Sequence, residues 1–229
     1  MPFRRVPSQP EIQAHPWLSR QAGRQLIADV QRMAIPELTR VFGQYGLYLR
    51  PSADIPPDLS GNMLNRVLSL QRRDGGFGGQ LTCLDGSLPL ASGSLSLVYA
   101  LFVFETSPDP GALMAEIART LKPEGVALVI GLNPWSPARL RWPTDPLRAA
   151  SLSWIERLAR EAGLEFARSQ HLGPFWPRVD ASLGGPIDKS WVDGFRAANL
   201  AVLRRREAGL TPLRKPQSAA RLRPGMSAG

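Results

Sequence analysis

The sequence predicts an α/β protein built on one doubly wound, mostly parallel sheet. Residues 95–104 and 126–130 are two nearly continuous apolar runs, which is typical of strands buried on both faces of a parallel sheet. Between them, residues 112–121 have apolar side chains at helical spacing, and Lys122, Pro123 and Gly125 mark the end of this helix. A strand, a helix and a strand joined by short links form a right-handed parallel crossover unit.

The segments before this unit predict shorter elements. Apolar residues recur at steps of three and four from Trp17, so we expect an amphipathic helix that ends before Pro36 and a short helix over residues 36–42. Compact apolar runs predict strands over residues 45–49 and 67–70. The glycine-rich run 74–79 precedes a strand pattern at residues 80–84, so it is expected to be a turn between strands.

The segments after the unit complete the sheet. Residues 133–146 hold four prolines and are expected to form a loop at the carboxyl edge of the sheet. Ser151 is expected to cap a helix over residues 151–162, followed by strands that begin at Leu164 and Ala198. This gives six or seven strands in one domain, 17–208, with a disordered segment at 1–16 and a basic, disordered tail at 209–229. Ligands of such sheets bind at the carboxyl ends of the strands.

Composition excludes several classes of protein. The 229 residues are 43% hydrophobic, which suffices for one core and differs from disordered, collagen-like or coiled-coil chains. The longest apolar run has ten residues, whereas a membrane-spanning helix needs about 20. No apolar segment follows Arg4 and Arg5, so we expect no secretory signal and a cytoplasmic location. Cys83 is the single cysteine, and with two histidines it indicates neither a disulfide nor a metal site.

The net charge of +9 is concentrated near the C-terminus. Residues 204–223 hold seven basic residues and one acidic residue, a net +6, so the remainder of the chain is close to +3. An anionic partner of this tail, RNA or lipid head groups, is one interpretation. A solvated terminus without a partner is the alternative.

Three consecutive motifs resemble one known family. Residues 85–98, DGSLPLASGSLSLV, resemble the "D-x-x-x-L-P-F-x-x-x-S-F-D-L-V" segment of class I S-adenosylmethionine-dependent methyltransferases of type 11. Residues 104–110 are similar to that family's "L-E-H-V-P-D-P", and residues 116–125 to its "E-x-x-R-V-L-K-P-G-G". The loop 131–136 is similar to "G-x-N-P-x-S" of a bacterial subgroup, so the resemblance covers about a quarter of the chain. It implies a Rossmann-like methyltransferase fold with S-adenosylmethionine as the cofactor.

The resemblance also implies site residues. The candidate cofactor-binding residues are Ser52, Gln71, Asp85, Gly86, Leu88 and Phe102, and the candidate catalytic residues are Glu105 and Asn133. In the family, the acid at the position of Asp85 faces the adenine. Glu105 would be the general base if one is needed, and Asn133 would orient an acceptor hydroxyl or amine. The alternatives are structural: Asp85 as a turn residue, Glu105 as a cap of the next turn, and Asn133 as a loop-packing residue.

The sequence departs from the family at the cofactor. The family's first strand ends in a "G-x-G-x-G" turn, but Leu49 is followed by RPSAD. The acidic residue that holds the ribose is replaced by Gln71, which is followed by two arginines, and the histidine of "L-E-H" is Thr106. The run 74–79 offers glycines as a displaced cofactor loop, although no helix pattern follows it.

Two functions are compatible with this pattern. The first is an S-adenosylmethionine-dependent methyltransferase that acts on an unknown small-molecule or macromolecular acceptor, where catalysis is mainly alignment of the reacting atoms. The alternative is a non-catalytic methyltransferase-fold protein that acts as a binding or regulatory module. We expect the cofactor to bind weakly or not at all, because the changed residues are those that would hold its methionine and ribose parts.

Overall fold

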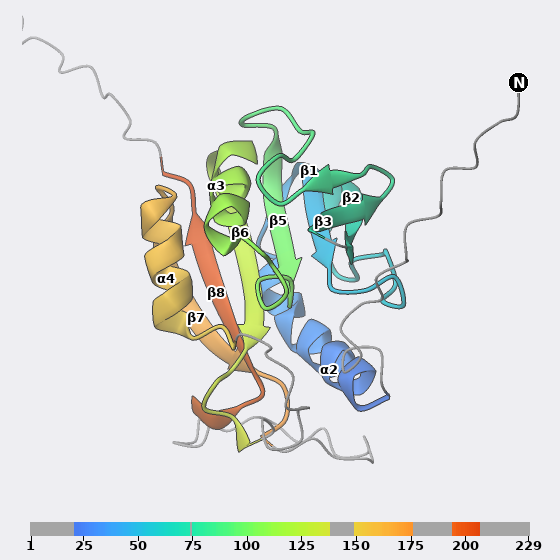
Figure 1. The fold of residues 1–229 in the computed structure, drawn as a ribbon, viewed down its shortest axis with the longest axis vertical. Helices are drawn as coiled ribbons and strands as arrows, with labels where there is room; N and C mark the ends of the chain where they lie inside the picture. Colours follow the sequence, from blue (N-terminus) through green and yellow to red (C-terminus); the bar gives the residue numbers. More distant parts are fainter. Residues whose placement is uncertain (1–20, 74, 138–148, 176–193, 207–229) are drawn as a thin grey trace, which may run out of the picture.

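The computed structural model describes residues 21–73, 75–137, 149–175 and 194–206, which form an eight-stranded sheet with helices on both faces (Figure 1). The elements follow along the chain as α2 (Gln21–Leu38), β1 (Phe42–Arg50), β2 (Met63–Arg73), β3 (Gly76–Gly79), β4 (Cys83–Leu84), β5 (Leu95–Leu101), α3 (Pro110–Thr120), β6 (Leu121–Leu132), α4 (Leu152–Glu161), β7 (Glu165–Leu172) and β8 (Ala198–Arg204).

The sheet has a parallel centre and antiparallel edges. Its order is β4-β3-β2-β1-β5-β6-β8-β7, in which β2, β1, β5 and β6 are parallel neighbours. A hairpin adds β3 and β4 at one edge, and β8 and β7 are antiparallel at the other. The predicted fold class is confirmed, and so is the crossover unit, because β5 and β6 pair in parallel and are joined through α3.

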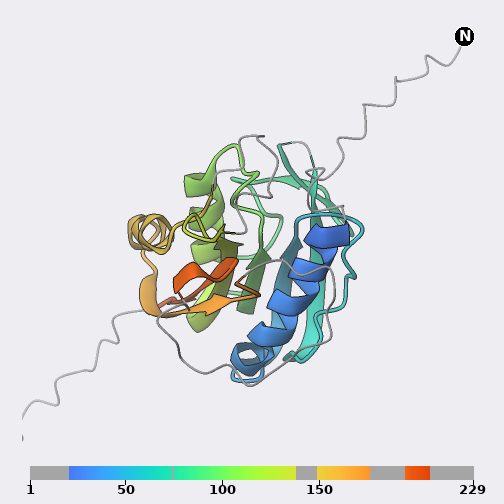
Figure 2. The same cartoon turned by 90° about the horizontal axis from the view of Figure 1, so that it is seen from below.

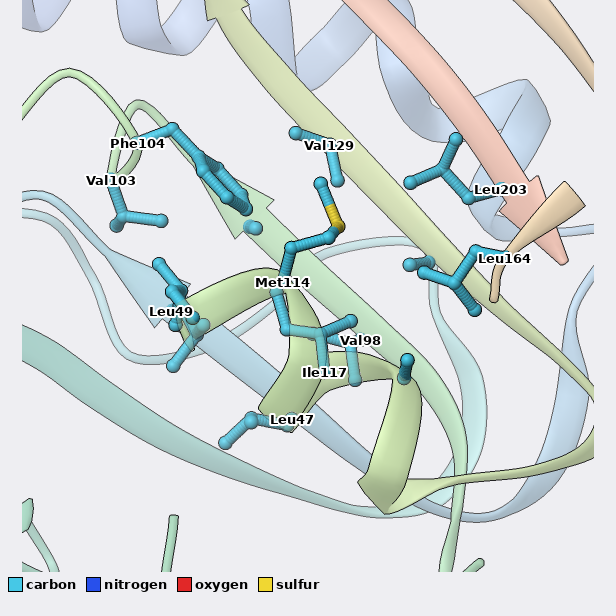
Figure 3. Packing of buried hydrophobic residues seen from close by; sticks show 14 of the residues in the cluster. Leu47, Leu49, Val98, Val103, Phe104, Met114, Ile117, Val129, Leu164 and Leu203 are labelled. Atoms are coloured by element: carbon cyan, nitrogen blue, oxygen red, sulfur yellow. The ribbon is translucent and has the colours of Figure 1, made fainter. Parts of the chain in front are cut away.

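Side chains alternate between two core layers. Tyr48 points to the face covered by α2, whereas Leu47 and Leu49 point to the face covered by α3 and α4. Figure 2 shows α2 on one side of the sheet and α3 and α4 on the other. In the second layer, Met114 and Ile117 of α3 pack onto the central strands (Figure 3).

Both helices on that face begin at a capping side chain. The carboxylate of Asp109 accepts a hydrogen bond from the Ala112 backbone N–H at 2.9 Å, and Pro110 follows as the first helical residue. Ser151 accepts from the Trp154 N–H at 3.2 Å and caps α4, as predicted. These caps satisfy backbone donors that the first helical turn leaves without partners.

The amino-terminal third differs from the prediction. Helix α2 continues through Pro36 to Leu38, and no second helix precedes β1. Proline removes one helical hydrogen bond, but only the last turn is affected, and the buried Leu38 anchors that turn in the core. Strand β1 also begins earlier than predicted, at Phe42, and Gly46 packs closely inside it: a Cβ there would be 2.4 Å from the Leu64 side chain.

The glycine-rich run is partly a strand. Residues 76–79 form β3, which pairs antiparallel with β2, so the turn is shorter than the predicted 74–79. No helix begins among the described residues of this run, which removes the displaced cofactor loop as an interpretation. Strand β4 is limited to residues 83–84 instead of 80–84, and β8 extends the predicted 198–203 by one residue.

The predicted terminal segments, 1–16 and 209–229, lie outside the described residues. The first three arginines of the basic segment belong to the fold. Arg204 ends β8, Arg206 forms a 2.9 Å ion pair with Glu165, and the Arg205 guanidinium donates to carbonyls at the end of α3, including Leu121 at 2.5 Å. Among the helices that the structure describes, none is long and apolar enough to cross a membrane.

Candidate functional site

The candidate site lies where the parallel strands end. The carboxyl ends of β1, β2, β5 and β6 meet at one edge of the sheet, and they place Arg50, Gln71, Arg72, Glu105 and Asn133 there. In open α/β sheets this edge is the usual ligand site.

Arg72 and Asp85 form a buried ion pair at this edge. The two side chains are 6% and 3% exposed, and Arg72 Nη1 donates to Asp85 Oδ1. The other oxygen, Oδ2, accepts from the Ser107 hydroxyl, and Arg72 Nη2 donates to the Val103 carbonyl at 2.7 Å. Burial lowers the pKa of Arg72, and the charge of Asp85 opposes this shift. Both oxygens of Asp85 are therefore bonded within the chain.

The guanidinium of Arg72 is enclosed from a second side. Its Cζ lies 4.1 Å from the centre of the Phe77 ring, which belongs to β3, and its Nη1 also donates to the Gly76 carbonyl. Cation and ring attract each other in this arrangement. The antiparallel hairpin thus helps to hold Arg72 on Asp85.

A second arginine connects the ends of β1 and β2. Arg50 Nη1 donates to the Ile55 carbonyl, and its Nη2 lies 3.2 Å from Gln71 Oε1. Burial lowers the pKa of Arg50. Ser52 Oγ accepts from the Asp54 N–H at 3.1 Å in the loop after β1. Ser52 and Gln71, the candidate residues for the methionine and ribose side, are therefore engaged with neighbouring residues.

Glu105 is the titratable group of this edge. It follows β5, is 4% exposed, and accepts a 2.6 Å hydrogen bond from the Leu132 N–H through Oε1. Its Oε2 is buried without a hydrogen-bond partner among the described residues. Burial raises the pKa of Glu105 to about 7, with hydrogen bonds and the charge of Arg72 opposing the rise. The carboxyl can therefore hold or release a proton close to neutral pH.

Asn133 connects two segments of backbone. Its amide nitrogen donates to the carbonyls of Gly194 and Arg196, each at 2.8 Å, and its oxygen accepts from the Trp135 N–H at 3.1 Å. Asn133 is buried, with 1% of the residue's surface exposed. It therefore joins the loop after β6 to the segment that enters β8.

The other three candidates lie in two different places. Leu88 is 3% exposed within the core layer of α3, where its N–H donates to Glu116 at 2.7 Å and its carbonyl accepts from Arg119 at 2.9 Å. Gly86 lies nearby, because a Cβ on it would be 3.3 Å from Ala112. Phe102 is buried in the opposite core layer, with a φ of 47°. The residues of the "E-x-x-R" motif therefore hold the loop before β5.

The structure brings together Asp85 and Glu105 around Arg72, and Gln71 with Arg50. Sequence reasoning did not assign roles to Arg50, Arg72 or Ser107. Arg72 carried a signal nonetheless: an arginine at the end of a strand that is buried in a parallel sheet needs an anionic partner at the same edge.

The comparisons identify the domain type. Residues 43–129 match the family model described as a methyltransferase domain. Over these residues the chain is similar to methyltransferase domains. The family resemblance of the sequence is thus confirmed, the family's cofactor is S-adenosylmethionine, and no acceptor is indicated.

Solved structures share the fold of the methyltransferase domain. The complex of the Haloferax volcanii Trm112 methyltransferase activator with a protein described as its methyltransferase matches with a TM-score of 0.57 and 18% identity, over 83% of this chain and 96% of that chain. A SAM-dependent methyltransferase from Aquifex aeolicus matches with 0.54 and 12%, over 82% and 95%. The [4+2]-cyclase SpnF matches with 0.50 and 16%, over 77% and 80%. No curated protein matches the sequence.

Proposed function

We propose that this chain is a methyltransferase-fold protein that serves as a binding or regulatory module and has lost the family's use of S-adenosylmethionine. The observation that carries the proposal is the buried bonding of Arg72, Asp85 and Ser107. The chain's own side chains take the positions at which the resemblance expects cofactor contacts.

The adenine side is the first support. A ligand that bonds to Asp85 has to displace Arg72 or Ser107 from its two oxygens. Removing one partner of a buried ion pair leaves the other charge uncompensated and costs about 3–5 kcal/mol. An adenine amino group is neutral and cannot replace the charge of a guanidinium.

The methionine and ribose side is the second support. The residues between β1 and β2 form no helix, so this loop offers no helix N-terminus to the ligand. Pro51, at the start of the loop, has no N–H, and Gln71 faces the cation of Arg50. S-adenosylmethionine carries a positive sulfonium, so two arginines at this edge disfavour it. The residues present do not fit this cofactor.

Calorimetric titration of the full chain with S-adenosylmethionine and S-adenosylhomocysteine tests the proposal. We expect no saturable heat with either ligand at concentrations up to about 1 mM. This limit means that any binding free energy is weaker than about −4 kcal/mol. A dissociation constant below about 100 μM for either ligand would overturn the proposal.

A second function, methyl transfer to an acceptor, is favoured by Glu105 alone. Its Oε2 has no partner among the described residues, and its pKa of about 7 suits a general base. In this function Glu105 takes a proton from the acceptor, whereas the amide of Asn133 already bonds the Gly194 and Arg196 carbonyls and the Trp135 N–H. Detectable cofactor binding together with a large loss of turnover in Glu105→Gln would favour it over the module.

The partner and location are also proposals. Arg204 and Arg206 lie beside Glu124 and Glu165, and Arg205 donates to backbone carbonyls. An anionic partner would therefore contact the basic residues that follow them in the sequence. Binding to RNA or anionic vesicles should then fall steeply with salt and disappear when residues 207–229 are deleted. Binding that survives deletion would place the anion site on the domain. The unpaired Cys83 supports a cytoplasmic location.

A further inference from the structure

A pocket of about 630 Å³ lies far from the candidate site, beside the amino-terminal halves of β1 and β2. Tyr45 and Arg66 lie opposite each other in the sheet and line it, together with Leu68. Tyr45 precedes Arg50 by five residues, and at about 3.3 Å per residue this is about 16 Å along the strand. The pocket therefore does not overlap the candidate cofactor edge.

The pocket exists because one part of the sheet has no helix over it. In the face that α3 and α4 cover, α3 contacts β6, whereas the connection 85–94, which contains no helix, lines the pocket beside β1 and β2. Leu90 and Ala91 of this connection form one wall of the pocket, and Leu95 lines it from β5, which pairs with β1 in the same sheet. The Glu116–Arg119 pair holds the connection in place, because Arg119 Nη1 donates to the Leu90 carbonyl at 2.9 Å. The wall is therefore fixed rather than loose.

The pocket combines apolar walls with a single positive charge. Leu68, Leu90 and Leu95 supply aliphatic surface, and the ring of Tyr45, which is 51% exposed, supplies an aromatic surface. Arg66 is exposed and, within the part of the chain that the structure describes, has no ion pair or hydrogen bond to its guanidinium. Among the described residues that line the pocket, none is acidic. An exposed guanidinium at the mouth of an apolar pocket is complementary to a carboxylate on an apolar body.

We propose that this pocket binds a small amphipathic organic anion, with its carboxylate on Arg66 and its apolar body against the leucines and Tyr45. The volume lies within the range of about 300–1,000 Å³ that is usual for small-molecule sites. A single cation suits one carboxylate better than a polyanion such as RNA, which needs an extended basic surface. The proposal does not depend on whether S-adenosylmethionine binds at the other edge.

The probe is decanoate, which is titrated into the full chain in a calorimeter. Decanamide, which has the same alkyl chain without the charge, is the control ligand. Decanoate is expected to bind one site per chain and more tightly than decanamide. Arg66→Gln should weaken decanoate about ten-fold or more, since a hydrogen bond to a charged group is lost, and should leave decanamide unchanged. Arg24→Gln is the control variant, because it removes the same charge from an exposed position on α2, in the opposite layer. It should leave the affinity for both ligands unchanged.

A second variant tests the position without removing charge. Ala91 lines the pocket and is exposed, so Ala91→Trp adds an indole to the cavity without disturbing the core. It should abolish decanoate binding while thermal unfolding stays close to that of the parent chain. Three results would overturn the proposal. They are decanoate binding that survives Ala91→Trp, a decanoate affinity of Arg66→Gln equal to that of the parent chain, and competitive displacement of decanoate by S-adenosylmethionine.

Discussion

Replacing Glu105 with glutamine should change how the stability of the protein depends on pH. The pKa of this carboxyl rises from 4.5 to about 7 on folding, chiefly because burial disfavours its charged form. The folded state therefore binds the proton more tightly than the unfolded state. This contribution to stability is fully present below pH 4.5 and is lost as the pH rises through about 7. At 1.36 kcal/mol per pH unit the loss is about 3 kcal/mol.

Glutamine cannot ionise, and its oxygen can still accept the hydrogen bond of the Leu132 N–H. Urea unfolding at several values between pH 4.5 and 8 should show that Glu105→Gln gains about 3 kcal/mol relative to the parent chain over this window. A constant offset is expected as well, because the substitution puts an amide N–H₂ in place of a buried oxygen that has no hydrogen-bond partner among the described residues. The pH dependence therefore carries the test.

Glu156→Gln is the matched control. Glu156 is 43% exposed on α4 and pairs with Arg160 on the surface, so its removal should leave the pH dependence unchanged within about 0.5 kcal/mol. If Glu105→Gln and the parent chain lose stability in parallel between pH 4.5 and 8, the carboxyl titrates normally and the reasoning about its burial is wrong.

Three further outcomes are expected in unfolding measurements. Arg72→Met should lower the free energy of unfolding by about 3–5 kcal/mol, and adding Asp85→Asn should recover most of this loss. An equal loss in the single and the double variant would show that the two side chains do not form a buried pair. Asp109→Ala should cost about 1 kcal/mol through the lost cap of α3, and no change would exclude it. Gly131→Ala should cost about 1–3 kcal/mol, because its Cβ would lie 2.4 Å from that of Ala150; a stability gain would refute the close approach.

The centre of the fold could be predicted from sequence because its signals are local. Residues 97–104 and 126–130 are apolar without interruption, and α3 carries its cap, its apolar stripe and its stop within about fifteen residues. The amino-terminal third was less predictable, since Pro36 was taken as the end of a helix and the strand that contains Gly46 was predicted too short. Both are tolerated inside elements by tertiary contacts: Gly46 beside Leu64, and the last turn of α2 by burial of Leu38. At these two positions tertiary packing outweighs the intrinsic secondary-structure preference of the residue.

The candidate site was less predictable because its bonds join residues distant in sequence. Motif matching found Asp85 and Glu105, and both lie at the expected edge. It could not find that Arg72 reaches Asp85 and the Val103 carbonyl, which are 13 and 31 residues away. The motif residue Leu88 also has a structural explanation, because its backbone is bonded to the Glu116–Arg119 pair. A motif can thus persist for its packing when its ligand contacts have changed.

The changes at the cofactor edge depend on one another. A buried Asp85 needs a positive partner or a hydrogen-bonded ligand, and Arg72 supplies the charge from inside the chain. An acid in place of Gln71 would pair with Arg50, whose Nη2 lies 3.2 Å from Gln71 Oε1, rather than restore a free ribose acceptor. The loop after β1 would still lack its helix and its glycines. We therefore expect that restoring a single residue would leave the binding of S-adenosylmethionine unchanged.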